Sequence, residues 1–438
     1  MIALPINRCR NSLRNLKRYG VNSQVGGLGT GMYLTSKTHA APKRVALLFN
    51  ANKVYDRQVI SGVGRYLAAT RVEWDLFIEE DFRGRAHNML SWEGDGVIAD
   101  YDDPEVTAAL STLTIPVVAV GGSYTDSSQY PPGVPYVATD NFKLVRLAYD
   151  HLIEQGLPRF AFYGLPPAPG NRWAREREDA FLHMVKIDHQ ECPVYRGSPT
   201  SAAGLRRSQN EMVEWVRSLP KPIGIVCVTD ARARQLLQAC IVADVAVPEQ
   251  VAIVGIDNEP MVQLLGRIPL TSVIQGAEEM GRIAARILHR MLQGVDCVGQ
   301  RILVPPSGIN AQASSQFQPI GSAYVMRARH YLRQYAHLGI KSEQVAHYVG
   351  VSRTVLDEHF KRELKQTVHE AILEQKLHVA RTLLADASIP RADVAIRSGF
   401  TSLQYMHTVF RREFKCTPCE MQKTLHDSVI QSPAIGAY

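Results

Sequence analysis

Short, almost wholly apolar runs recur along residues 44–256 with stretches of helical periodicity between them, and this alternation constrains the fold more than any other feature. Apolar runs that end in polar residues or glycine are typical of strands buried on both faces of a sheet. Strands that alternate with helices predict parallel α/β layers. Because the series restarts near Arg159, we expect two similar lobes. The predicted strands are Arg44–Phe49, Trp74–Ile78, Gly96–Ala99, Ile115–Val120, Arg159–Tyr163, Ile223–Val228 and Val251–Ile256.

Polar side chains follow several of these strands, and the carboxyl ends of parallel strands commonly form binding sites. Asp, Asn and Arg pair with adjacent hydroxyl groups, and an aromatic ring covers the apolar face of a sugar, so the pattern favours a carbohydrate site. The candidates are Asp56, Arg57, Ser123, Trp173, Arg175, Thr229, Asp230 and Asp257. Strand-end carboxylates also cap helices, and this alternative stays open for Asp140 and Asp257.

The chain carries no signature of a common enzyme class. It has no Gly-x-Ser-x-Gly elbow, no Walker loop, no His-Glu-x-x-His motif and no closely spaced set of metal ligands. Cys416 and Cys419 form a lone C-x-x-C, without the second ligand pair of a zinc site or the context of a thioredoxin. We therefore expect neither an enzyme nor a cofactor or metal.

The seven cysteines are scattered and odd in number, which does not resemble a secreted disulfide framework. No apolar run approaches the ~18 residues that span a bilayer. These features predict a cytoplasmic protein without a membrane partner.

Charge is unevenly distributed along the chain, whose net charge is +7. Residues 1–44 carry +8, residues 321–438 carry +5, and the segment between them is acidic. An acidic middle followed by a basic end predicts a small-molecule domain joined to an anion-binding domain. The alternative is a chance clustering of solvated charges.

The C-terminal segment contains an internal repeat of about 50 residues. Val345–Gly350 and Val394–Gly399 both read V-A-x-x-x-G, and Phe360–Lys365 matches Phe410–Lys415. In each copy a short helix reaches glycine, turns, and restarts at a Ser or Thr cap. The second helix then presents an apolar stripe, formed by Leu356, Phe360 and Leu364 in one copy and by Met406, Phe410 and Phe414 in the other. This pattern predicts two helix-turn-helix motifs.

The opposite face of each second helix carries side chains that suit DNA. Side chains early in such a helix reach base edges in the major groove, and later basic side chains suit phosphates. The alternative is a charged face that is only solvated. The helical segment Val368–Leu384 would hold the two DNA-contacting helices about one DNA turn, ~34 Å, apart. The candidates are Ser352, Arg353, Thr354, Asp357 and Lys361, then Ser402, Leu403, Gln404, His407, Arg411 and Arg412.

Residues 339–423 resemble the AraC-type DNA-binding domain. The similar motifs are L-x-x-A-R-x-L-L at Leu377–Leu384, S-G-F at Ser398–Phe400, and the T-P pair that begins at Thr417. Lys365 and Lys415 depart from that family, which favours glycine after the second helix.

Residues 45–315 resemble the periplasmic-binding-protein-like core of lac-repressor-type regulators, with I-V-G-I-D-N at Ile253–Asn258 and L-T-S-V-I-Q at Leu270–Gln275. This core joined to a C-terminal AraC-type domain resembles the bacterial xylose-operon activators, down to L-L-F-N-A-N-K-x-Y-D-R-Q at Leu47–Gln58. The resemblance implies a homodimeric activator whose partners are D-xylose, a direct-repeat operator in double-stranded DNA, and RNA polymerase. It also adds Gln275 to the sugar contacts. The alternatives are the same architecture tuned to another pentose, or a sugar carrier.

The expected organisation is a leader at residues 1–43, a two-lobed sugar-binding domain at 44–316, and an all-α AraC-type domain with two helix-turn-helix motifs at 317–438. The leader is basic, free of acidic residues before the first strand, and without apolar periodicity. We expect it to be disordered or untranslated, with translation starting at Met32. A basic arm that binds DNA is the alternative.

Overall fold

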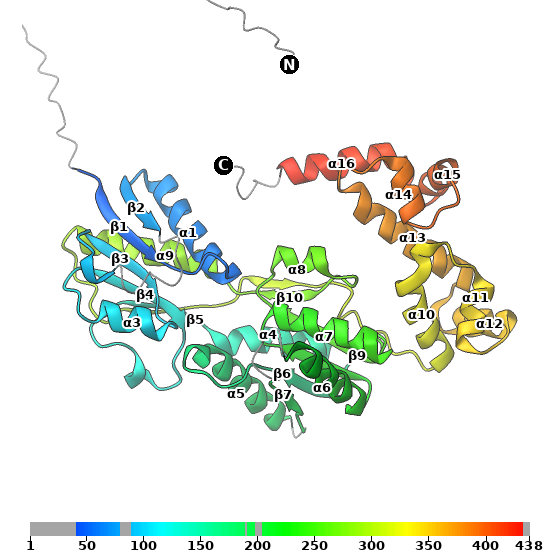
Figure 1. Cartoon of the computed structure of the whole chain (residues 1–438), viewed down its shortest axis with the longest axis horizontal. Helices are drawn as coiled ribbons and strands as arrows, with labels where there is room; N and C mark the ends of the chain where they lie inside the picture. The colour runs from blue at the N-terminus through cyan, green and yellow to red at the C-terminus, as the bar shows by residue number, and fades with distance from the viewer. Residues whose placement is uncertain (1–40, 79–88, 189–190, 198–203, 432–438) are drawn as a thin grey trace, which may run out of the picture. The chain divides into compact units, whose positions relative to one another are not determined.

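The computed structural model describes residues 41–78, 89–188, 191–197 and 204–431 (Figure 1). The expectations for the leader, including a start at Met32, concern residues that lie outside this part apart from residues 41–43. The described residues form two α/β lobes, followed by a wholly helical segment from Ala323 onward.

The first lobe is built on a six-stranded sheet whose order is β11-β5-β4-β3-β1-β2. Every neighbouring pair of strands in it is parallel. Its elements are β1 (Lys43–Leu48), α1 (Val54–Thr70), β2 (Trp74–Ile78), β3 (Gly96–Asp100), α3 (Pro104–Leu110), β4 (Val117–Gly122), β5 (Tyr136–Thr139), α9 (Ala277–Leu292) and β11 (Arg301–Val304).

The second lobe has a six-stranded sheet of order β12-β10-β9-β8-β6-β7, parallel except for the edge strand β12. Its strands are β6 (Phe160–Tyr163), β7 (Val194–Tyr195), β8 (Ile223–Cys227), β9 (Val251–Ile256), β10 (Thr271–Ile274) and β12 (Gly308–Asn310). Its helices are α4 (Asn141–Glu154), α5 (Arg172–Ile187), α6 (Leu205–Ser218), α7 (Asp230–Ala243) and α8 (Pro260–Leu265).

Both sheets are covered on both faces, as the continuous apolar runs predict. Val45 and Leu47 pack into the core under α1 and α9, whereas Ala46 and Leu48 face the core under α3. The predicted α/β alternation and the two lobes are therefore confirmed. The fourth predicted strand begins two residues later than expected, at Val117.

The chain returns to the first lobe after building most of the second, which the sequence did not indicate. Helix α9 packs on α1 so closely that Cβ atoms at Gly62 and Gly281 would each lie 1.9 Å from a backbone oxygen of the other helix. Strand β11 then pairs with β5. The first lobe therefore takes elements from two separate stretches of the chain. Two of the connections between the lobes border the cavity, through Thr139 and Asn141 and through Gln275.

The C-terminal segment consists of α10 (Ala323–Tyr335) and two helix-turn-helix units on either side of α13 (Val368–Leu384) (Figure 1). The first unit is α11 (Ser342–Val349) with α12 (Arg353–Leu364), and the second is α14 (Arg391–Arg397) with α15 (Leu403–Phe414); α16 (Pro418–Gln431) follows. The stripes expected to be buried are buried at Leu356, Phe360, Met406 and Phe410. Helix α13 contributes to the cores of both units. The duplicated motif is therefore confirmed.

Lys365 and Lys415 adopt the left-handed conformation that usually favours glycine, with φ of 58° and 57°. Each lysine ends the second helix of its unit, and its ammonium group donates to the carbonyl of Arg362 or Arg412. The departure from glycine therefore leaves the turn conformation unchanged, at the cost that an L-residue bears there.

Candidate functional sites: the cavity between the lobes and the paired helix-turn-helix units

A cavity of about 380 Å³ opens between the two lobes at the carboxyl ends of their strands. The first lobe contributes the β1–α1 junction and residues at the carboxyl ends of β3, β4 and β5. The second lobe contributes α5, the N-terminus of α7, and the residues that follow β9 and β10. The polar lining residues include Asn52, Lys53, Tyr55, Asp56, Asp100, Asp102, Thr139, Asn141, Arg177, Thr229, Arg232, Asp257, Glu259 and Gln275, together with the ring of Trp173.

A continuous hydrogen-bond chain forms the second-lobe wall of the cavity. The buried Arg177 guanidinium donates to Asn141 Oδ1 at 3.0 Å and to Gln275 Oε1 at 2.8 Å. It also lies 4.7 Å from the ring centroid of Trp173. The Gln275 amide in turn donates to Asp257 Oδ1. These residues therefore present fixed donors and acceptors beside an aromatic surface, which is the chemistry of a polyol site.

Burial in this wall raises the pKa of Asp257 to about 8, and the nearby Asp230 carboxylate adds to the rise, while Arg177 and Gln275 oppose it. Asp257 also has φ of 123°, a backbone conformation that L side chains rarely adopt. It does not cap a helix, because α8 is capped by Glu259. Asp140, by contrast, accepts from Lys143 N and caps α4. The capping alternative therefore holds for Asp140 and fails for Asp257.

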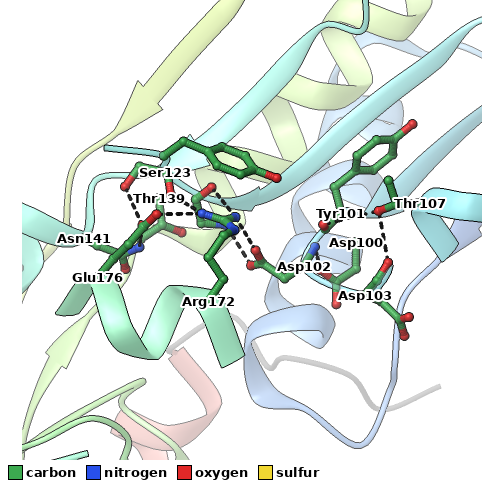
Figure 2. A network of polar contacts seen from close by, with 12 residues as sticks. Asp100, Tyr101, Asp102, Asp103, Thr107, Ser123, Thr139, Asn141, Arg172 and Glu176 are labelled. Carbon is green, nitrogen blue, oxygen red and sulfur yellow. Dashed lines mark hydrogen bonds and ion pairs between the residues drawn. The ribbon is translucent and has the colours of Figure 1, made fainter. Parts of the chain in front are cut away.

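The facing wall contains a compact charged network that crosses from one lobe to the other (Figure 2). Arg172, at the start of α5, donates to Asp102 Oδ1 at 2.6 Å and to Gly122 O at 3.0 Å. Its other terminal nitrogen lies 2.7 Å from Glu176. Burial raises the pKa of Asp102 to about 6, with a further rise from Asp100 and an opposing effect of Arg172. The network therefore fastens the second-lobe helix α5 to the first lobe beside the cavity.

The structure brings five of the nine predicted sugar residues into the cavity lining: Asp56, Trp173, Thr229, Asp257 and Gln275. Arg57, Ser123, Arg175 and Asp230 do not line it.

Each of these four residues has another place in the structure. Arg57 forms an ion pair with Glu259 of the other lobe at 3.1 Å. The Ser123 hydroxyl donates to Glu176 at 3.1 Å. Asp230 is buried and accepts from Ser272 Oγ and from the backbone of Glu259, so it holds the loops behind the cavity.

Arg175 is exposed because it lies two positions from Arg177 on α5, which is about 200° around the helix. The arginine of α5 that reaches the cavity is thus Arg177, which sequence reasoning missed, as it also missed Arg232 of α7. The helical phase set by buried Ala174, Phe181 and Val185 could have indicated it, since Arg177 falls on their side of the helix. Asp100, the last residue of β3, and Asp102, two residues later, were also missed, although their strand-end position carried the same signal as Asp56.

The helix-turn-helix units expose most of the side chains that were expected to contact DNA. Arg353, Thr354 and Gln404 are exposed in the first turn of α12 or α15, and Lys361, Arg411 and Arg412 are exposed farther along these helices. His407 is half-buried on α15. Ser352 and Ser402 are the N-caps of α12 and α15.

Asp357 and Leu403 instead have partners inside the domain, and Arg353 forms an exposed ion pair with Glu343 at 2.7 Å. Asp357 accepts from Val368 N at 2.9 Å and so fixes the start of α13. Leu403 packs against the core of the second unit. Neither side chain is free to read a base edge in this arrangement.

Comparison with known proteins agrees with this two-part organisation. Family models match at residues 44–142 (XylR N-terminal domain), 149–315 (periplasmic binding protein-like domain) and 345–424 (helix-turn-helix domain). The xylose operon regulatory protein of Escherichia coli K12 is 46% identical over 377 residues, which cover 86% of this chain and 96% of the relative. That of Haemophilus influenzae is 42% identical, with coverage of 86% and 98%. The chain belongs to the xylose operon regulatory protein family.

Solved structures support the same assignment. A structure described as the xylose-binding transcription activator xylR matches with a TM-score of 0.79 and 44% identity, covering 87% of this chain and 98% of that one. A LacI family regulator from Mycobacterium smegmatis, 21% identical with a TM-score of 0.50 over 62% of this chain and 98% of that one, shows the same fold. Members of the xylose operon regulatory protein family are transcription regulators and not enzymes.

Within the described residues, no helix is both long and apolar enough to cross a bilayer. Among the same residues, no group of three or more His, Cys, Asp or Glu side chains is arranged to hold a metal ion.

Proposed function

We propose that this family member binds D-xylose in the cavity between the lobes and responds by activating transcription of xylose-catabolic operons. The proposal rests on the hydrogen-bonded series Arg177–Gln275–Asp257 in the second-lobe wall of the cavity. These side chains offer directional hydrogen bonds and face Asp100 and Asp102 of the first lobe. A site built to satisfy hydroxyl groups rejects an analogue that lacks one, because its buried partners are then left unpaired. The names of the relatives point to xylose as the sugar.

Calorimetry with a panel of pentoses tests this proposal. We expect D-xylose to bind more tightly than L-arabinose, D-ribose and D-lyxose. Arg177→Met should weaken D-xylose binding about 10- to 100-fold, since hydrogen bonds to charged groups contribute about 1.5–3 kcal/mol. Arg175→Met, two positions away on the exposed side of α5, is the matched control and should bind as the wild type does.

The results also separate the alternatives. Tightest binding of another pentose would show the same architecture tuned to that sugar. Binding of D-xylose without any effect on DNA affinity would favour a carrier. Turnover of the sugar would contradict the regulator altogether.

We propose that the two helix-turn-helix units occupy adjacent major grooves of a direct-repeat operator. Helix α13 has 17 residues and is therefore about 25 Å long, a suitable spacer for readers one DNA turn, about 34 Å, apart. Exposed Lys361, Arg411 and Arg412 supply the phosphate contacts. Affinity should accordingly fall as salt rises.

We further propose that the active species is a homodimer that contacts RNA polymerase and works in the cytoplasm, at the chromosome. Met261, Leu264 and Leu265 on α8 are 59%, 86% and 65% exposed, an apolar surface that a second copy of the chain would cover. Sedimentation of the wild type and of Leu264→Asp tests the dimer, since the variant should dissociate. Transcription from the operator with purified RNA polymerase, with and without D-xylose, tests activation.

A further inference from the structure

A buried carboxylate joins the second lobe to the first helix of the DNA-binding domain. The Glu249 side chain is 1% exposed and lies two residues before β9. Arg333 of α10 donates to both oxygens of the Glu249 carboxylate, with Nη2 2.5 Å from Oε1 and Nη1 2.5 Å from Oε2. Arg329, one turn earlier on α10, lies 3.1 Å from Oε1. Because an arginine fork fits a carboxylate in one plane, this contact fixes orientation as well as distance.

A second contact joins the same two parts of the molecule. Asp244 ends α7, in the left-handed conformation with φ of 56°. Tyr348 of α11 donates its hydroxyl to Asp244 Oδ1 at 3.1 Å, and His330 Nε2 of α10 also lies 3.1 Å from that oxygen. Helix α11 belongs to the first helix-turn-helix unit, so the contact reaches the DNA-reading part directly.

Both contacts sit at the far ends of elements that begin or end at the sugar cavity. Strand β9 begins two residues after Glu249 and ends immediately before Asp257, and α7 lies between its N-cap Thr229 and its C-cap Asp244. Asp257 and Thr229 line the cavity. A rigid strand or helix transmits a displacement from one of its ends to the other. A loop would change its own conformation instead and transmit less of the displacement.

The arginines also overcome the cost of burying the Glu249 charge. Burial alone raises the pKa of Glu249, but the hydrogen bonds and charges of Arg333 and Arg329 hold it below its ordinary value. Separation of Glu249 from the arginines of α10 would leave a buried charge uncompensated. This cost favours the arrangement in which α10 stays docked on the second lobe.

We infer that Glu249 and Asp244 hold the first helix-turn-helix unit in a fixed orientation on the second lobe, and that this docking transmits closure of the sugar cavity to the DNA-reading helices. Glu249 is then a positioning residue, remote from both ligands. Arg333 also donates to Val247 O at 2.7 Å, and this bond remains when the two carboxylates are lost. One such bond and the covalent link do not fix a single orientation, so sugar binding no longer changes the orientation of the DNA-contacting helices. The inference rests on the proposed sugar-dependent DNA binding.

The test measures a coupling factor in the full chain, defined as the ratio of DNA Kd without sugar to DNA Kd with saturating D-xylose. The DNA probe is a duplex with the direct repeats that the wild type selects from a random pool. We expect a factor of at least about 5 in the wild type, the lower end of common allosteric couplings. Glu249→Gln and Asp244→Ala should each bring it below about 2 while xylose Kd and sugar-free DNA Kd change less than about 3-fold.

The control is Glu214→Gln, which breaks an exposed ion pair with Arg217 within α6 and should keep the wild-type factor. Deuterium exchange in α10 should increase in Glu249→Gln and not in the control. Asp244 is exposed, so its variant gives a result even if Glu249→Gln does not fold. If Glu249 and Asp244 only stabilised the fold, their variants would weaken xylose binding and DNA binding together and leave the coupling factor unchanged. That result would overturn the inference. A wild type with no sugar dependence would instead refute the proposed function.

Discussion

The pH dependence of sugar binding should report the ionisation of Asp257. We expect this carboxylate to accept a hydrogen bond from the sugar in its ionised form, because it ends a buried strand in the cavity wall and receives the amide of Gln275. Burial raises its pKa to about 8. At neutral pH the empty site therefore holds mostly the protonated acid, which must lose its proton before the sugar binds in this way.

The magnitude follows from the pKa. With a pKa of about 8, the ionised fraction rises from about one-tenth at pH 7 to about nine-tenths at pH 9, because each pH unit changes the ratio tenfold. The Kd for D-xylose should fall about tenfold over the same range, since affinity scales with the fraction of competent protein. Asp102 and Asp230, with pKa values of about 6, are largely ionised throughout this interval and add little.

Calorimetric titration of D-xylose at half-unit steps from pH 7 to pH 9 measures this change. Asp257→Asn, which cannot ionise, should bind weakly and show a flat profile. A wild-type Kd that rises with pH would mean that the neutral acid donates to the sugar. A flat wild-type profile would remove Asp257 ionisation from the binding step.

Other predictions concern the DNA-binding domain. Arg353→Ala and Gln404→Ala should each cost about 1–3 kcal/mol and relax preference at one base position, whereas Arg411→Ala should weaken binding to all sequences and lower the salt slope. Competition binding with single-base operator variants distinguishes these outcomes, and a uniform loss in Gln404→Ala would reassign it to a phosphate. Lys365→Gly and Lys415→Gly should each stabilise the domain by about 0.5–1 kcal/mol, because glycine bears no penalty in the left-handed conformation. Thermal unfolding checks this, and a lower Tm would show that the lysine bonds to the helix end outweigh the backbone cost.

Much of the architecture is encoded in local pattern. The apolar run at Val251–Ile256 coincides with β9, and the helix expected at Val368–Leu384 coincides with α13. The helix-turn-helix repeat was visible because its glycine turns and buried stripes are short-range features. Such signals reflect which face of a segment is buried, and that depends on neighbours a few residues away.

The membership of each lobe and the choice of cavity residues were decided only by tertiary structure. Helix α9 packs against α1, which lies more than 200 residues earlier in the chain. The periodicity of α9 alone does not indicate which helix it packs against. The sequence pointed to Arg175, but the phase of α5 against its core brings Arg177 into the cavity instead.

The docking contact between Glu249 and Arg333 depends on the same kind of long-range information. Its two partners lie 84 residues apart, in domains with separate cores. Local burial thus indicated seven of the twelve strands in the described residues, the helix-turn-helix repeat and the two kinds of domain, but not β5, β7, β10, β11 or β12. Which polar groups meet was decided only when distant, separately folded surfaces came together, because a polar side chain gains its role from partners that local periodicity does not specify.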